Sequence, residues 1–526
     1  MSHQKSKTSL AVPITMESSS DPTQAADETA PLLTHHESDS SADTLRETAG
    51  DAALSTTSLY PRAVFFIFAL SFVADLGGAL VDTPELRLLE MAVCRDYYLD
   101  HNPSVIGSPP LSYVDEKLCK IKEIQVDLAY IMAVKSLLMT VPGLLLGIFY
   151  GRLADKFGRK PVAFLGMLGQ VLAYFWVILV CYFHQAFSTR LVLLSPIFLL
   201  VGGGSRVLSA IISTIIADVA PEKMRTTIFY AVGAGLLITD VVAAAVGSWL
   251  LSKDLWLPFK FSAPIICLSF PLILAMPETL VRSKSADTVN GQTVDHGVSD
   301  QSTMSPWLVS LVRRWFSDLV QTLRSLNPLV IRKEITVCLS IIFLTAFSRA
   351  ANGLFTQYTS KLLDWPIATA GYILSVKSLV TLLTLVALAC ITQVLERKLG
   401  TRPLYLDVWV IRSSLMALTA GAILVAASKE PVLLISGSLL GSTGNGITQA
   451  LQGLLATFAD RSSTGQLFTG AALLELLAQF SGSLSFAKLF EVGLGTGSIW
   501  GMGLPFYISG VITLLSTVLS FLLRTA

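Results

Sequence analysis

Several stretches of about 20 residues carry almost no charge, and they constrain this chain more than any other feature. Examples are Pro161 to Tyr182, Leu191 to Ile216 and Phe506 to Leu523. A helix of that length crosses the ~30 Å hydrocarbon core of a bilayer. Charged residues make up only 14% of the 526 residues, whereas a soluble domain has roughly 25%. The sequence therefore predicts an all-α polytopic membrane protein whose main partner is the lipid bilayer.

Twelve such spans can be placed, six in each half of the chain. They cover residues 62–81, 126–150, 161–182, 191–217, 226–251 and 258–277, and then residues 335–358, 367–392, 403–427, 432–457, 464–487 and 501–523. Basic residues crowd the loop after the second span, at Arg152, Lys156, Arg159 and Lys160. By the positive-inside rule, this side is cytoplasmic and both termini join it.

These spans divide the chain into four segments. Residues 1–60 are rich in Ser, Thr, Asp and Glu and lack an apolar signal region, so we expect a disordered cytoplasmic tail. Two six-helix bundles, residues 61–278 and 335–526, flank a cytoplasmic linker of residues 279–334. The end of the linker is amphipathic and predicts either a helix in the membrane interface or a surface helix packed on the bundle.

The two halves of the chain are repeats. Lys135 and Lys377 lie in similar sequences, AYIMAVKSLL and GYILSVKSLV, and are separated by 242 positions. The same separation relates Gly158 to Gly400, Pro161 to Pro403 and Asp218 to Asp460. Such a constant offset over ninety residues indicates duplicated halves with a parallel relation, which is the architecture of one class of secondary transporter.

The loop after the second span has a distinctive pattern, Gly151-Arg-Leu-Ala-Asp155-Lys156-Phe-Gly158-Arg159-Lys160. Glycines allow a tight turn between two helices, and Asp155 and Arg159 can reach the ends of neighbouring helices. Simple anchoring at the cytoplasmic surface explains the basic residues but leaves Asp155 and the glycines unexplained. The pattern resembles the loop motif of the major facilitator superfamily, and all of its defining positions are filled.

This resemblance covers about residues 60 to 526 and implies two pseudo-symmetric six-helix bundles. In the family, the motif latches the two halves together on the cytoplasmic side. The implied latch consists of Gly151, Asp155, Lys156, Gly158, Arg159, Lys160, Asp218 and Arg225. The long first external loop, with its paired cysteines, is similar to that of the proton-coupled folate transporter branch and its fungal relatives. Some of those relatives are presumed to export metabolites.

Cys94 and Cys119 lie together in that long polar loop, which we expect to face the non-cytoplasmic, oxidising side. A disulfide between them fits this location. The alternative is two free thiols.

Ionisable side chains inside the spans are candidates for substrate binding or proton coupling, because each costs roughly 2.5 kcal/mol or more at the bilayer centre. We expect Asp75 to pair with Lys135, and Arg206 with Asp240. Glu475 lies mid-span with no obvious cation beside it and is the best candidate for a proton site. The remaining candidates are Arg349 and Lys377, while Arg412 is expected to be structural or to reach the membrane surface.

If the two expected pairs form, Arg349 and Lys377 remain to attract an anion. This motivates the hypothesis that the substrate is an organic anion, for example a carboxylated metabolite. Lys135 and Lys377 occupy equivalent repeat positions, so a structural role common to both halves is the alternative for these lysines.

The sequence has no phosphate-binding Gly-Lys-Ser/Thr loop, no metal-ligand cluster and no nucleophile constellation. We therefore expect neither an enzyme nor a primary pump, and neither a cofactor nor a metal. A net charge of +1 gives no indication of a nucleic-acid partner. We predict a monomeric secondary transporter that exports a small metabolite, coupled to protons, in the plasma membrane rather than the vacuolar membrane. The alternatives are proton-coupled uptake of a nutrient anion and a transporter-like sensor that signals through its tail.

Overall fold

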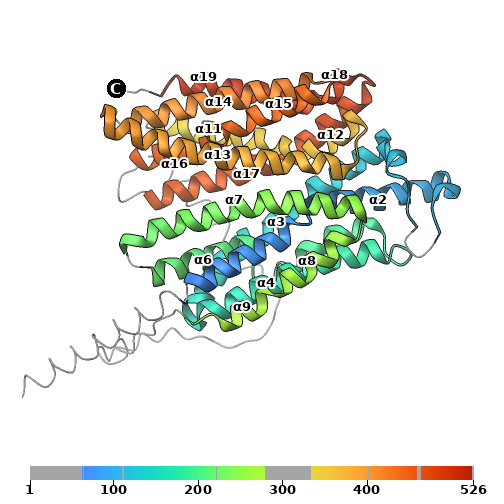
Figure 1. The fold of residues 1–526 in the computed structure, drawn as a ribbon, viewed down its shortest axis with the longest axis horizontal. Coiled ribbons are helices and arrows are strands. Elements are labelled where there is room, and N and C mark those ends of the chain that lie inside the picture. The colour runs from blue at the N-terminus through green and yellow to red at the C-terminus, as the bar shows by residue number, and fades with distance from the viewer. Residues whose placement is uncertain are drawn as a thin grey trace, which may run out of the picture. The chain divides into compact units, whose positions relative to one another are not determined.

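The computed structural model describes residues 62, 64–108, 112–220, 222–278, 333–400, 403–458 and 464–523. The chain divides into two units, Met1–Ser55 and Thr56–Ala526, and every described residue belongs to the second unit. The predicted tail of residues 1–60 lies outside the described residues, as does the predicted linker apart from its last two positions. The described part of the chain consists of helices joined by short turns (Figure 1).

The first half starts with a helix at residues 64–79, which bends at Leu80 and Val81 and continues as α2 (Asp82–His101). Two short 3-10 helices follow, η1 (Pro103–Val105) and η2 (Glu116–Lys120). The remaining helices are α3 (Lys122–Phe157), α4 (Arg159–Tyr182), η3 (Thr189–Leu194), α5 (Ser195–Phe198), α6 (Gly204–Val219), α7 (Glu222–Lys253), α8 (Leu257–Cys267) and α9 (Ser269–Ala275).

The second half repeats this order without the long first loop. Its first span is α11 (Lys333–Arg349), which continues through η4 (Ala350–Leu354) into α12 (Phe355–Leu363). The remaining helices are α13 (Ile367–Leu399), α14 (Pro403–Ala427), α15 (Pro431–Ser442), η5 (Thr443–Gly446), α16 (Ile447–Phe458), α17 (Thr464–Gly495), α18 (Ile499–Met502) and α19 (Leu504–Ser520).

Nine helical segments of the described chain are long and apolar enough to cross a membrane. The fourth, tenth and twelfth predicted spans correspond to shorter helices, namely α5 with α6, α15 with α16, and α19. Large apolar side chains such as Leu383 of α13 and Val511 of α19 are exposed, as expected of helices that contact lipid. The prediction of an all-α polytopic membrane protein with twelve transmembrane helices is confirmed.

The fourth and tenth spans are both interrupted. Gly202, Gly203 and Gly204 have positive φ angles and separate α5 from α6. A side chain at Gly202 would collide with the backbone of Gly166 in α4. The hydroxyl of Tyr150 supports the break, because it donates to the carbonyl of Leu200 at 2.8 Å and accepts from the amide of Gly202 at 2.7 Å.

The matching break in the tenth span is η5, whose Gly444 lies 242 positions after Gly202. The repeat offset found in the sequence therefore extends to the two broken helices. Interrupted helices near the midplane are where secondary transporters of this architecture bind their substrates and coupling ions. These breaks direct the search for a functional site to the centre of each half.

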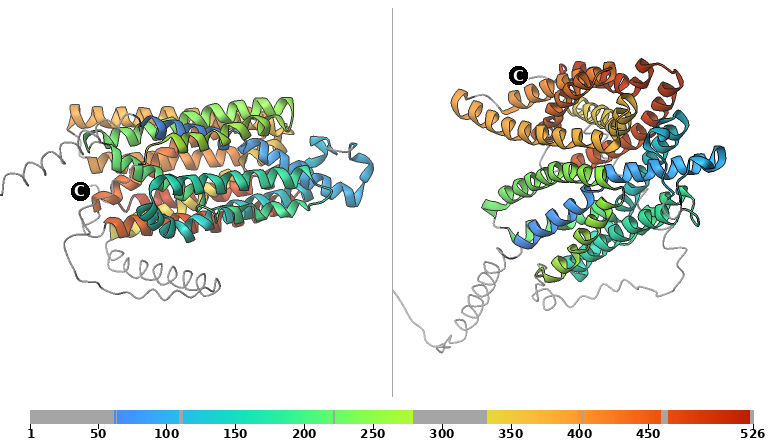
Figure 2. Two further views of the ribbon diagram at one scale, coloured as in Figure 1. Left: turned by 90° about the horizontal axis from the view of Figure 1, so that it is seen from below. Right: turned by 45° about the vertical axis from the view of Figure 1, so that its right-hand side comes forward.

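The two halves meet along two helix pairs. α7 of the first half packs along α13 of the second, and α3 packs along α17 (Figures 1 and 2). α3 begins near the disulfide described below and ends at the predicted latch. These two levels of the molecule are called here the disulfide end and the latch end.

Candidate functional site

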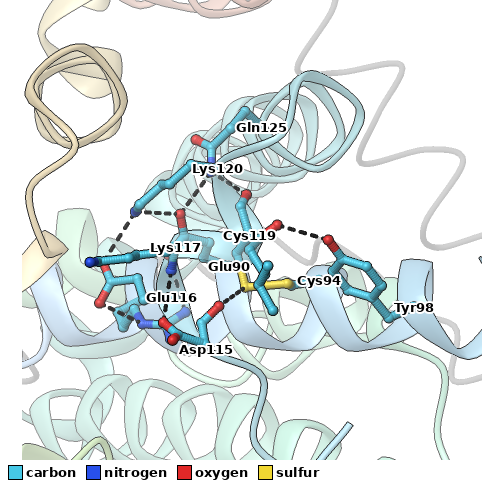
Figure 3. Close-up of a disulfide and its surroundings, with 11 residues drawn as sticks. Glu90, Cys94, Tyr98, Asp115, Glu116, Lys117, Cys119, Lys120 and Gln125 are labelled. Carbon is cyan, nitrogen blue, oxygen red and sulfur yellow. Dashed lines mark hydrogen bonds and ion pairs between the residues drawn. A yellow bond between two sulfur atoms is a disulfide. The ribbon is translucent and has the colours of Figure 1, made fainter. Parts of the chain in front are cut away.

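A disulfide holds the end of the first-half loop against α2 at the disulfide end. The Sγ atoms of Cys94 and Cys119 are 2.15 Å apart and bonded (Figure 3). Cys119 belongs to η2, so the bond fixes this 3-10 helix beside the middle of α2. Of the two alternatives for these cysteines, a disulfide or two free thiols, the structure contains the disulfide.

Next to the disulfide lies a buried group of polar side chains, here called the disulfide clamp: Arg87, Glu90, Glu116, Lys120 and Gln125. Glu90 is fully buried and accepts from Arg87 at 3.1 Å, from Lys120 at 2.7 Å and from Gln125 at 2.7 Å (Figure 3). Glu116 pairs with Arg87 at 3.2 Å and with Lys120 at 3.1 Å. Two carboxylates thus balance two cations.

The disulfide clamp also binds the second half of the chain. The amide nitrogen of Gln357 donates to the backbone and side-chain oxygens of Gln125, at 2.6 and 2.9 Å. Glu116 accepts from the backbone N–H of Ile367 at 2.7 Å, at the first residue of α13, where the helix dipole favours a carboxylate. Lys361 donates to the carbonyl of Lys120. The clamp therefore ties the halves together at the disulfide end.

The latch end has its own charged network. Arg159 binds Asp155 at 2.5 Å and Asp218 at 3.1 Å, so it joins α3, α4 and α6. Glu278 accepts from the backbone N–H groups of Arg159 and Lys160, at 2.9 and 3.2 Å. Gly158, between α3 and α4, has φ +108° and ψ 160°, a conformation found almost only in glycine.

These partners all belong to the first half, whereas the resemblance implied a latch that joins the two halves. Lys160 donates to the carbonyl of Leu274, again in the first half, and Lys156 lies over the ring of the adjacent Phe157 at 5.3 Å. The side chain of Arg225 lies outside the described part of the chain. Within the described part, the predicted latch residues hold the first bundle together at its latch end.

The predicted pairs of intramembrane charges are wrong. Lys135 pairs with Glu85 of α2, so it is not available to Asp75. Arg206 is exposed and lines a cavity of about 410 Å³ at the latch end, together with Gly151, Asp155 and Arg159. Asp240 instead lies close enough to Asp75 and Asp82 for the negative charges to repel one another.

Asp82 and Glu85 are not among the predicted site residues, because the predicted first span ends at residue 81. The helix instead bends there and runs on to His101, which carries both carboxylates into the bundle. They line a first-half pocket of about 270 Å³ with Lys135, Gln170 and Tyr174. The three-residue spacing of Asp82 and Glu85, which places them on one face of a helix, is the sequence signal that could have included them.

The second half contains a pocket of about 100 Å³ between α11, α13, α14, α15 and α19. Arg349 and Lys377 line it, and no carboxylate is among the described residues of its wall. Arg349 donates to the hydroxyl of Thr448 at 2.9 Å and lies 3.9 Å from Glu475. The expectation that Glu475 has no adjacent cation is therefore wrong.

Lys135 and Lys377 occupy equivalent positions but have different partners. Each approaches the first turn after the bend in the first span of its own half. Lys135 binds the carboxylate of Glu85 there, whereas the ammonium of Lys377 lies 4.1 Å from the centre of the Phe355 ring. The described residues place no carboxylate within ion-pair distance of Lys377. Arg412 lies over the Phe521 ring at 4.6 Å and reaches backbone carbonyls near the end of α19, which agrees with a structural role.

Comparison with known proteins adds the family. A sequence profile described as Major Facilitator Superfamily matches residues 120–486. The chain is 29% identical over 462 residues to the MFS efflux pump atnC of Emericella nidulans, with 86% of each chain covered. It is 26% identical to the efflux pump ustT of Aspergillus flavus, covering 83% of this chain and 84% of that one.

Solved structures agree on the fold. The nucleoside transporter NupG superposes with a TM-score of 0.57 at 14% identity, over 88% of this chain and all of NupG. A D-xylose–proton symporter gives a TM-score of 0.56 at 14% identity, over 87% of this chain and 97% of that one. Identity this low concerns the fold alone. The matched profile covers more than half of the chain, so the chain belongs to the Major Facilitator Superfamily and is a transporter rather than an enzyme.

Proposed function

We propose that this transporter exports a small organic metabolite that carries an anionic group, such as a carboxylate. The two halves would alternate access to a midplane site. The observation that carries the proposal is the second-half pocket, where Lys377 contacts an aromatic ring and no carboxylate among the described residues. Lys377 is half-buried, and a cation partly withdrawn from water without a counter-charge is unfavourable unless a ligand supplies one.

Arg349 supports the same assignment. Its distance of 3.9 Å from Glu475 is long for an ion pair, and the two side chains keep 31% and 42% of their surface exposed. A substrate carboxylate could therefore displace Glu475 and form the shorter, two-pronged contact that guanidinium groups favour. The direction of transport rests on the relatives, which are named efflux pumps at 29% and 26% identity.

The test is to delete the gene in its native host and quantify metabolites in the cells and in the medium. Export predicts compounds that are retained in the deleted cells and lost from the medium. If the medium instead keeps a nutrient that the parent strain depletes, the protein is an importer and the proposed direction is wrong.

We expect Lys377→Gln to reduce export of the retained compounds at least about tenfold while the amount of folded protein is unchanged. The reason is that its ammonium has no carboxylate partner that would be orphaned by the change. Lys135→Gln is the matched variant at the equivalent position. It removes the partner of Glu85, so we expect it to lower the amount of folded protein by leaving a carboxylate unpaired. Equal export by wild-type and Lys377→Gln transporters would contradict the assignment.

We also propose Glu475 as the group through which protons are coupled to transport. Substrate and Glu475 would compete for Arg349, so the charge state of Glu475 and substrate binding would be linked. Glu475→Gln should therefore abolish the pH dependence of transport in membrane vesicles. A variant whose transport follows the wild-type pH profile would remove Glu475 from this role.

A further inference from the structure

The first-half pocket carries a surplus of negative charge. Lys135 is the one cation among the described residues of its wall, and it forms an ion pair with Glu85. Asp82 lines the same pocket, its side chain is exposed to it, and no cation of the described residues lies within ion-pair distance of it. Asp240 and Asp75 lie close enough to Asp82 to repel it, and Lys135 lies close enough to attract it, so two acids oppose one cation. The pocket is therefore opposite in charge to the one that contains Lys377.

Two buried polar atoms in or near this pocket have no hydrogen-bond partner among the described residues. One is Oδ2 of Asp75, the residue after Ala74, which lines the pocket. The other is the amide nitrogen of Gln170, in the wall of the pocket itself. An orphaned buried polar atom costs about 1–3 kcal/mol. An ammonium group, with its three donors, would satisfy the Asp75 oxygen, whereas the Gln170 amide nitrogen is itself a donor and needs an acceptor oxygen.

The two charged regions are brought together where α7 packs along α13. Gly371 of α13 lies against Thr83, the residue after Asp82. One turn further along α13, the hydroxyl of Ser375 donates to the carbonyl of Val241, the residue after Asp240, at 2.7 Å. Lys377 follows two residues later, about 9 Å along the helix from Gly371 at 1.5 Å per residue. The residues next to Asp82 and Asp240 in the first half therefore contact the part of α13 that precedes Lys377 in the second half.

We propose that the substrate is a zwitterion, an organic molecule that carries a protonated amine as well as a carboxylate. This inference rests on the proposed function and adds the second charge. The carboxylate binds Lys377 and Arg349, and the amine binds Asp82 beside Asp75 and Asp240. Molecules with this pair of groups include amino acids, their derivatives and peptides with free ends.

The test starts from the compounds that cells lacking the transporter retain. They are reacted with an amine-labelling reagent to find which carry a free amine, and are then purified. Each is offered to inside-out membrane vesicles that contain the full chain, in its original form and after N-acetylation, which removes the positive charge and keeps the carboxylate. We expect the wild-type transporter to take up the amine form at least about tenfold faster than the acetylated form.

Asp82→Asn should abolish this preference by slowing uptake of the amine form while the acetylated form is unaffected or faster. The matched control is Asp254→Asn, which changes a carboxylate in the turn between α7 and α8, 4.0 Å from Lys260 and away from the pocket. That control should keep the preference.

The outcomes separate the two proposals. Retained compounds that are anions without an amine would overturn the zwitterion and leave the proposed export intact. Equal uptake of the two forms by the wild type would also overturn it, as would an Asp82→Asn variant that alters only the pH dependence of uptake, because the acids would then bind protons. If no compound is retained, the proposed export fails and the zwitterion fails with it.

Discussion

Replacing Gly158 with alanine is expected to cause the largest loss of folded protein of any single change at the latch end. Its φ of +108° with ψ of 160° costs a residue with a side chain about 1–3 kcal/mol. In addition, an added Cβ would lie 2.6 Å from Oε2 of Glu278, the carboxylate that caps the start of α4. The clash would push Glu278 away from the two backbone N–H groups that it binds.

Gly400→Ala is the matched control, because Gly400 is the repeat equivalent of Gly158. Its φ is +60°, a left-handed conformation that costs alanine about 1–2 kcal/mol. Apart from its own helix and chain neighbours, the described residues place no atom within 4 Å of the added Cβ. Fluorescence-detected size-exclusion chromatography of heated samples would measure both variants. A Gly158→Ala transporter as heat-resistant as Gly400→Ala would show that the contact with Glu278 contributes nothing.

Replacing Glu90 with glutamine is expected to cost about 3–5 kcal/mol, because removing one partner of a buried ion pair leaves the other charge uncompensated. Glu90 is fully buried, and its carboxylate faces both Arg87 and Lys120. Glutamine fills the same volume, but it leaves the disulfide clamp with two cations and one carboxylate. It also weakens the hydrogen bond that Gln125 donates to residue 90, and Gln125 in turn accepts from Gln357 of the second half. Thermal stability and folded yield are the measurements.

Glu491→Gln is the control for Glu90. Glu491 also accepts two hydrogen bonds, from Tyr130 at 2.7 Å and from Lys488 at 2.8 Å, but it lies at the surface with Lys488 62% exposed. Exposed pairs contribute little to stability, because water and salt screen their charges. If the two variants lose equal stability, burial is not what makes the disulfide clamp strong.

The features with a local cause could be predicted from the sequence. Long uncharged stretches predict the membrane spans, and the repeat offset of 242 positions predicts the duplicated halves. The breaks at Gly202 and Gly444 are separated by the same offset. The contacts of Arg159 with Asp155 and Asp218 also follow from the loop motif, because those residues lie at adjacent helix ends.

The partners of the intramembrane charges could not be predicted, because they depend on how far a helix continues and how it is rotated. Lys135 was assigned to Asp75 by depth alone, but α2 extends the first span and presents Glu85 instead. The disulfide clamp was missed for a similar reason. Its residues come from α2, η2 and α3, and they meet because a covalent bond folds the loop back. The sequence indicates that the two cysteines can form a disulfide, but it does not indicate how the loop between them runs.

Both sulfur atoms of the disulfide belong to the first half, and this has a kinetic consequence for the transport cycle. In the alternating access proposed above, the bonds from Gln357, Lys361 and Ile367 would be lost when the halves part at the disulfide end. The disulfide and the ion pairs around Glu90 would stay intact, because they lie within the first half. The surface that receives the second half is therefore prefolded before every closing event. No loop has to be ordered again, and closing avoids the conformational entropy of about 1–2 kcal/mol per residue that a flexible loop would lose. In this scheme, each closing event would bring the same two preformed surfaces into contact, the disulfide clamp of the first half and its partners in the second half.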